Sequence, residues 1–130
     1  MPHIDHIAIW ARDVDALSAF YQSIFDVEVG PRYVNAAKGF SSRFLSFRSG
    51  ARIEIMATCA LPLLETPAGT QRFGLAHVAI SLGSEREVDE LTQRLRDSGV
   101  PVLDGPRRTG DGYYESVVLD PEGNRIELAV

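Results

Sequence analysis

Apolar and polar residues alternate at the start of the chain and then change to a helical spacing. Residues 6–10 read His-Ile-Ala-Ile-Trp, and this period of two is typical of a β-strand. Asp13 is a plausible N-cap for the helix that follows. The apolar stripe of this helix has a spacing of three and four residues: Val14, Leu17, Phe20, Tyr21, Ile24 and Phe25. Three extended runs come next, near residues 28–34, 40–47 and 51–57, so the first half predicts strand, helix and three strands.

The second half predicts the same order of elements. A strand at 77–81 precedes Ser84-Glu-Arg-Glu87, which has the pattern of a capping box at the start of a helix. The apolar residues of this helix are Val88, Leu91 and Leu95, and Gly99 suits its C-terminal end. Extended runs near 101–103, 113–119 and 125–130 follow. The turn Asp120-Pro-Glu-Gly-Asn124 joins the last two runs.

The two halves are also related residue by residue. His6-Ile-Ala-Ile recurs 71 residues later as His77-Val-Ala-Ile, and Gly50-Ala-Arg-Ile-Glu-Ile55 recurs 73 residues later as Gly123-Asn-Arg-Ile-Glu-Leu128. Matches in the same order at nearly the same offset indicate a tandem duplication. We therefore expect an α+β fold of two βαβββ modules in a single domain 1–130. Module one is 1–60, the connector is 61–74 and module two is 75–130.

Four polar residues occupy equivalent strand positions in this repeat. Because strand residues alternate between faces, His6 and Glu54 point away from the isoleucines beside them, and so do His77 and Glu127. Glu54 taken alone is best explained as a solvated residue of an edge strand, but the recurrence of both residue types favours a shared role. Two imidazoles and two carboxylates that converge suit a divalent metal of the Ni, Zn, Co, Mn or Fe type. Such a metal can act as a Lewis acid on a pair of substrate oxygens.

Strand pairing suggests further residues of a substrate site. If the loop 120–124 closes a hairpin with Val118 opposite Glu127, Tyr114 faces the same cavity as Glu127.

The equivalent pairing in the first half puts Leu45 opposite Glu54. Arg43 is then a candidate for binding a substrate carboxylate, although a solvated arginine is an equally good interpretation. Trp10 and Met56 are candidates for an apolar pocket wall, with plain core packing as the alternative.

The composition of the chain restricts the kinds of partner and the cellular location that we expect. The chain has 130 residues, a net charge of −5 and a hydrophobic content of 45%, so we expect a globular domain that binds neither nucleic acid nor a membrane. No apolar run is long enough for a spanning helix. The single cysteine, Cys59, cannot form an internal disulfide, and the start of the chain lacks the features of a signal peptide. We therefore expect a cytoplasmic protein.

The motifs described above resemble those of the vicinal-oxygen-chelate superfamily, which groups glyoxalase I, bleomycin-resistance proteins and extradiol dioxygenases. The similarity covers nearly the whole chain, and it is closest to small bacterial glyoxalase I-like proteins. It rests on His6-Ile-Ala-Ile, Ala19-Phe-Tyr-Gln-Ser-Ile-Phe25, Arg52-Ile-Glu-Ile55, Gly74-Leu-Ala-His-Val-Ala79 and Asp120-Pro-Glu-Gly-Asn-Arg-Ile-Glu-Leu128. The resemblance implies two βαβββ modules that form a cup-shaped mixed sheet around the metal, and a homodimer.

The resemblance also implies roles for the four residues. His6, Glu54, His77 and Glu127 match the ligands of one divalent metal per site in the glyoxalase I branch. In that branch the carboxylates at positions 54 and 127 also transfer protons through a metal-chelated enediolate. The implied function is a lyase or isomerase that acts on a small α-oxygenated carbonyl compound.

Two alternative functions remain open at this point. The first is an extradiol-type dioxygenase that uses His6, His77 and Glu127, and the second is a non-catalytic protein that binds a small molecule or antibiotic. The residues that hold glutathione in glyoxalase I, a basic residue after the first His and an Asn after the first Glu, have no match here. The neighbourhoods read Ile-Ala-Ile-Trp10 and Ile-Met-Ala-Thr58, which favours a substrate without glutathione.

Overall fold

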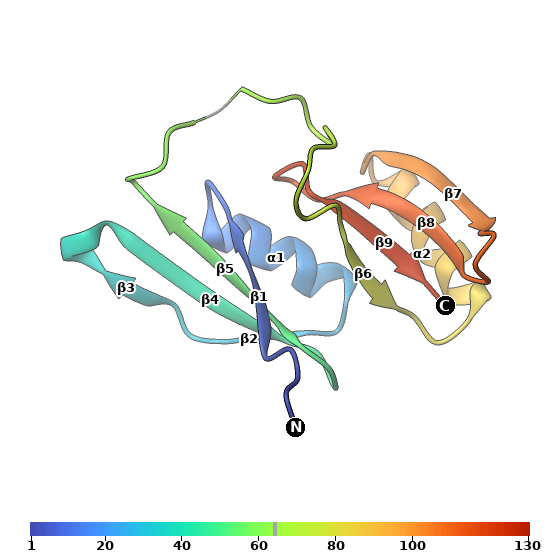
Figure 1. Cartoon of the computed structure of the whole chain (residues 1–130), viewed down its shortest axis with the longest axis horizontal. Coiled ribbons are helices and arrows are strands. Elements are labelled where there is room, and N and C mark those ends of the chain that lie inside the picture. Colours follow the sequence, from blue (N-terminus) through green and yellow to red (C-terminus); the bar gives the residue numbers. More distant parts are fainter. Residues whose placement is uncertain (64) are drawn as a thin grey trace. The chain divides into compact units, whose positions relative to one another are not determined.

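Each half of the chain forms a mixed β-sheet with one long helix. The computed structural model describes residues 1–63 and 65–130, which divide into two compact units, Met1–Glu65 and Thr66–Val130 (Figure 1). Unit 1 contains β1 (His6–Trp10), α1 (Val14–Ile24), β2 (Glu28–Val29), β3 (Tyr33–Asn35), the 3₁₀ turn η1 (Ala36–Lys38), β4 (Phe40–Ser46) and β5 (Arg52–Thr58). Unit 2 contains β6 (Val78–Ser81), α2 (Glu85–Asp97), β7 (Val102–Arg108), β8 (Tyr114–Leu119) and β9 (Arg125–Ala129). The fold class is α+β, as predicted.

The two sheets have equivalent topologies. The strand order is β1-β5-β4-β2 in unit 1, where β3 also pairs with β4, and β6-β9-β8-β7 in unit 2. The first and last strands of each unit run parallel, with Ala8 beside Glu54 and Ala79 beside Glu127, and the other pairs are antiparallel. The duplication read from the sequence therefore extends to the strand order and to the register of the parallel pair.

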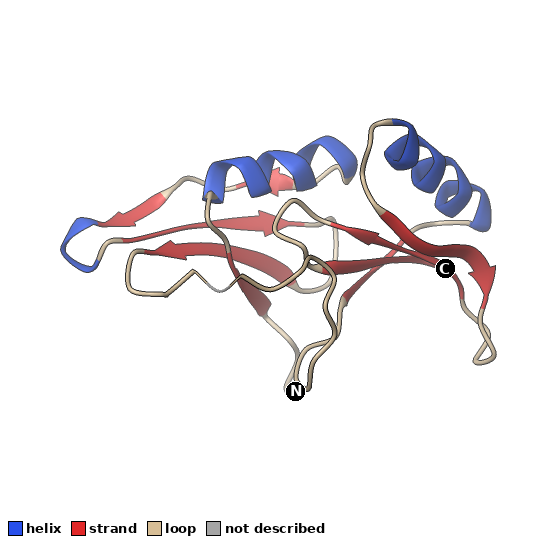
Figure 2. Cartoon of the chain, turned by 90° about the horizontal axis from the view of Figure 1, so that it is seen from above, coloured by secondary structure: helices blue, strands red, loops and turns tan. Residues whose placement is uncertain are grey.

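Each helix covers one face of the sheet in its own unit (Figure 2). The predicted caps are present: the Asp13 carboxylate accepts a hydrogen bond from the amide of Ala16 at 2.9 Å, and Ser84 accepts one from the amide of Glu87 at 3.2 Å. Gly99 takes the left-handed conformation after α2, with a φ of +88°. The buried residues of the helices include Val14, Leu17, Tyr21, Val88, Leu91 and Leu95, which belong to the two predicted stripes. The opposite face of each sheet carries the polar residues of interest.

Two predicted strands differ from the structure by more than one residue at an end. The run 28–34 is divided into β2 and β3 because Pro31 has no amide hydrogen for the ladder. Strand β7 extends well past the predicted run 101–103, up to Arg108. Its register against β8 is irregular, and Gly105 fits at the irregularity because a Cβ there would clash with the carbonyl oxygen of Glu115.

The register of the β8–β9 hairpin differs by one residue from the predicted register. Val117, and not Val118, lies opposite Glu127. The loop keeps all five residues 120–124 outside the ladder, because the carboxylate of Asp120 accepts hydrogen bonds from the amides of Glu122 and Asn124 at 2.9 Å. A shift by one residue moves every side chain of β8 to the other face of the sheet.

The β4–β5 pair shows the same shift. Phe44, and not Leu45, lies opposite Glu54, while Leu45 is fully buried on the helix face. The ring of Phe44 therefore lies on the same face as Glu54, whereas the predicted pairing placed it on the helix face.

Candidate functional site

His6 and Glu54 form a polar pair on the sheet face of unit 1 opposite α1. The Nε2 atom of His6 lies 3.8 Å from Oε1 of Glu54, and the Nδ1 atom lies 2.7 Å from the Asp5 carboxylate. The same carboxylate accepts a hydrogen bond from Arg52 at 2.7 Å. Hydrogen bonds from His6 and then Arg52 lower the pKa of Asp5. Because an ionised Asp5 can only accept, His6 donates from Nδ1 and presents Nε2 toward Glu54.

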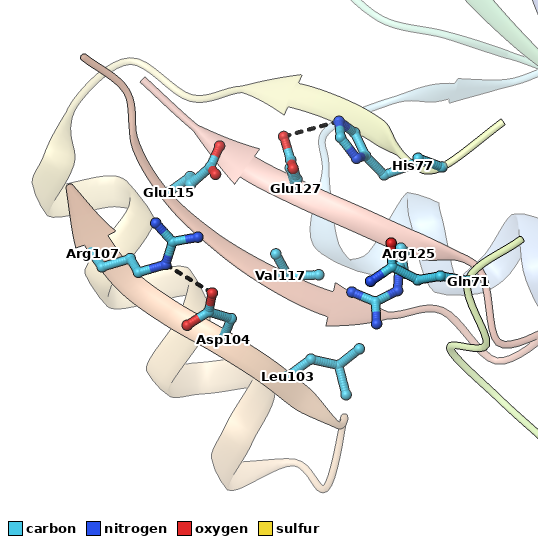
Figure 3. A pocket seen from close by; sticks show the side chains of 10 residues that line it. Gln71, His77, Leu103, Asp104, Arg107, Glu115, Val117, Arg125 and Glu127 are labelled. Carbon is cyan, nitrogen blue, oxygen red and sulfur yellow. Dashed lines mark hydrogen bonds and ion pairs between the residues drawn. The ribbon is translucent and has the colours of Figure 1, made fainter. Parts of the chain in front are cut away.

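His77 and Glu127 form the equivalent pair in unit 2. Their Nε2 and Oε2 atoms are 3.1 Å apart, as the dashed line in Figure 3 shows. The Glu54 and Glu127 side chains are each 17% exposed, and those of His6 and His77 are 38% and 40% exposed. The two pairs thus have the same degree of access to solvent, as equivalent positions of a repeat should.

The substrate-site candidates of unit 1 lie on both faces of the sheet. Trp10 pairs with Met56 in the β1–β5 ladder, on the face that carries His6 and Glu54, and Trp10 is 48% exposed. Arg43 lies on the helix face, which corrects the predicted pairing. Its Nε donates to Asp15 of α1 at 2.9 Å, so Arg43 connects β4 to the helix.

Tyr114 is the second residue that the register shift moves. Its hydroxyl donates a hydrogen bond to Asp89 of α2 at 2.6 Å, so the side chain lies on the helix face and not with Glu127. Glu115 lies on the face where Tyr114 was expected, and it pairs with Ala129 of β9.

A cavity of about 400 Å³ lies in unit 2 beside the His77–Glu127 pair (Figure 3). Its charged lining residues are Asp104 and Arg107 of β7, Glu115 of β8, and Arg125 and Glu127 of β9. The sequence did not predict that Asp104 and Arg107 line one cavity. Regular alternation places these two residues on opposite faces of a strand, and only the irregular register of β7 brings them together.

One ion pair and one pair of neighbouring carboxylates contribute to the electrostatics of this cavity. Arg107 donates to Asp104 at 2.7 Å, and this hydrogen bond lowers the pKa of the Asp104 carboxyl. Burial raises the pKa of Glu115, and the negative charge of Glu127 raises it further. The cavity therefore contains the neutralised pair Asp104–Arg107, the carboxylates of Glu115 and Glu127, which repel each other, and the guanidinium of Arg125.

The donor set of the two His–Glu pairs fits a divalent metal. Imidazole nitrogen and carboxylate oxygen are the ligands that Zn²⁺ and its neighbours accept, and each pair already brings one of each together. Within the described residues, no group of three or more His, Cys, Asp or Glu side chains is arranged so that it could hold a metal ion. Each unit therefore contains one imidazole and one carboxylate of the kinds that such an ion binds.

A comparison with protein-family models identifies the family of the chain. The family model of the glyoxalase/bleomycin resistance protein/dioxygenase superfamily matches residues 3–128. The chain belongs to this superfamily. Its members include enzymes such as glyoxalase I, typically bind a divalent metal and often dimerise.

Several individual proteins resemble the chain over most of its length. The uncharacterized protein YqjT of Bacillus subtilis is 29% identical over 126 residues, covering 95% of this chain and 94% of YqjT. A glyoxalase family protein from Bacillus cereus has a TM-score of 0.80 at 17% identity, with 99% of this chain and 93% of that protein covered. The trypanothione-dependent glyoxalase I of Leishmania major has a TM-score of 0.74 at 21% identity, with 98% and 86% covered. The two solved structures have the same fold as this chain.

Neither of the α-helices that the structure describes is long and apolar enough to cross a membrane.

Proposed function

We propose that this superfamily member is a divalent-metal-dependent lyase or isomerase of the glyoxalase I type, acting on a small α-oxygenated carbonyl compound. The observation that carries the proposal is the repeated His–Glu pair, with matched exposure in the two units. His6, Glu54, His77 and Glu127 would hold the metal. When bound, such an ion stabilises negative charge on two vicinal oxygens of the substrate.

The protein residues would move the proton. A carboxylate on this face, Glu127 or Glu54, accepts the proton of the carbon that carries a hydroxyl and returns it to the neighbouring carbonyl carbon. The proton of the hydroxyl group moves to the former carbonyl oxygen, so no atom is gained or lost and the net reaction is an isomerisation. Asp5 supports this role in unit 1, because it fixes the orientation of the His6 ring beside Glu54.

Metal content per chain, measured by elemental analysis on untagged protein, tests the ligand set. We expect about one ion per chain in the wild type and a sharp loss in Glu54→Ala and Glu127→Ala. Glu28→Ala is the matched control, since Glu28 is an exposed residue of β2 in the same sheet as Glu54. An ion that survives the loss of Glu54 would instead favour a three-ligand dioxygenase, which oxygen consumption with a catechol would reveal. No ion in any variant after reconstitution would favour a binding protein.

Hydrogen exchange at carbon tests the chemistry. Candidate α-hydroxycarbonyl compounds incubated with metal-loaded protein in D₂O should lose their carbon-bound proton signal in ¹H NMR spectra. Glu127→Gln should slow this exchange about a hundredfold or more while substrate binding falls less. Equal loss of binding and exchange would argue against a base role for Glu127.

A further inference from the structure

The equivalent arginines Arg52 and Arg125 have different surroundings. Each begins the last strand of its unit, two residues before the glutamate of the His–Glu pair. The guanidinium of Arg52 donates to Asp5 at 2.7 Å and lies 4.3 Å from the centre of the Phe44 ring. Its charge is therefore neutralised and one of its faces is covered.

Both partners are missing at the equivalent positions of unit 2. The residue before His77 is Ala76, where unit 1 has Asp5, and Val117 lies opposite Glu127, where Phe44 lies opposite Glu54. Two small apolar side chains thus replace a carboxylate and an aromatic ring. Both Ala76 and Val117 line the cavity of about 400 Å³, so these replacements help to open it.

Arg125 lines this cavity without a carboxylate partner. Its Nε donates to the carbonyl oxygen of Gly69 at 3.0 Å, and no described residue forms an ion pair with it. The other cavity arginine, Arg107, is already paired with Asp104 (Figure 3). The side chain of Glu127 is directed to His77 in the same view. Arg125 therefore has an unneutralised charge and free terminal N–H groups, which a half-buried guanidinium needs to satisfy.

We propose that Arg125 binds a carboxylate group of the substrate, which makes the substrate an anion and makes Arg125 a determinant of specificity. The planar guanidinium can donate two parallel hydrogen bonds to two carboxylate oxygens. The proposal rests on the proposed function only in taking the cavity beside His77 and Glu127 as the substrate site.

An NMR titration of metal-free protein with L-lactate and L-lactamide tests the charge preference. The two probes have the same shape and differ in one charged group. We expect lactate to bind about tenfold more tightly than lactamide and to shift the guanidinium signals of Arg125. Arg125→Met should abolish the preference, and Arg125→Lys should retain part of it. The matched control Arg52→Met should keep the preference, because the equivalent arginine already has a carboxylate partner.

The controls separate this proposal from the proposed function. The spectra report whether each variant is folded, and the guanidinium shift is measured on the unaltered chain. A charge preference in protein that takes up no metal would support the role of Arg125 while the proposed function fails. Absence of lactate binding, an equal affinity for both probes, or an unchanged preference in Arg125→Met would overturn the role of Arg125, whatever the metal content.

Discussion

At the scale of single residues, a carboxylate next to one histidine distinguishes the two His–Glu pairs. Asp5 receives a hydrogen bond from His6 at 2.7 Å, whereas the residue before His77 is Ala76. An acceptor behind the ring fixes the tautomer and raises the basicity of the nitrogen that binds a metal. We predict that Asp5→Ala lowers the affinity for Zn²⁺ about tenfold, as measured by competition with a chromophoric chelator on untagged protein.

A charge-matched variant gives the control for this prediction. Asp26 forms an exposed ion pair with Arg48, and both side chains are more than four-fifths exposed, at 87% and 88%. Asp26→Ala therefore removes the same charge from unit 1 without touching His6, and it should leave the affinity for Zn²⁺ unchanged. Equal affinities of the two variants would show that Asp5 has no part in orienting the ligand.

At the scale of elements, a buried pair of hydroxyl groups joins α2 to its sheet. Thr92 and Ser116 are 0% and 1% exposed, and their hydroxyl oxygens are 2.7 Å apart. The Thr92 hydroxyl also contacts the carbonyl oxygen of Val88 at 2.6 Å. We predict that Thr92→Val lowers the free energy of unfolding by about 1–3 kcal/mol, because the Ser116 hydroxyl loses its partner in a buried site. Urea denaturation measures this change.

The double variant Thr92→Val/Ser116→Ala checks the cause of that loss. Replacing both hydroxyls leaves no unsatisfied group at the helix–sheet contact, so the double variant should be more stable than Thr92→Val alone. If the two losses simply add, the effect comes from the shape of the valine side chain and the hydroxyl pair is not a unit.

The elements were predictable where the signal is local. The caps at Asp13 and Ser84 and the apolar stripes of the helices need only neighbouring residues, and the sequence predicted them correctly. The duplication predicted the order of the strands and which residue types recur. Strand register depends instead on how many residues each loop keeps outside the ladder. The side-chain hydrogen bonds of Asp120 decide that number in the β8–β9 hairpin.

The register shift had its largest effect on the candidate site. The predicted pairing placed Arg43 and Tyr114 on the faces that carry the glutamates, and both residues instead connect a strand to the helix of their unit. The same shift brings Phe44 and Val117 to the polar faces, where their difference in size separates the two units. The position of His6 was unaffected, because its face follows from alternation within β1. His77 directly precedes β6 and still lies beside Glu127.

At the scale of the whole molecule, each unit brings one His–Glu pair, so a metal with ligands from both units would couple metal binding to the stability of the entire chain. An ion that binds only the folded state stabilises it by about 2.7 kcal/mol at a free concentration of 100 times its Kd. For a chain of this length that corresponds to a rise in the melting temperature of about 10 °C.

We predict this rise for the wild type with Ni²⁺ or Zn²⁺, measured by calorimetry, and its loss in both Glu54→Ala and Glu127→Ala. The exposed Glu28→Ala should keep it. Loss of the rise in only one of the two ligand variants would assign the metal to one unit, and the equivalence of the two pairs would then be a relic of the duplication without a common role.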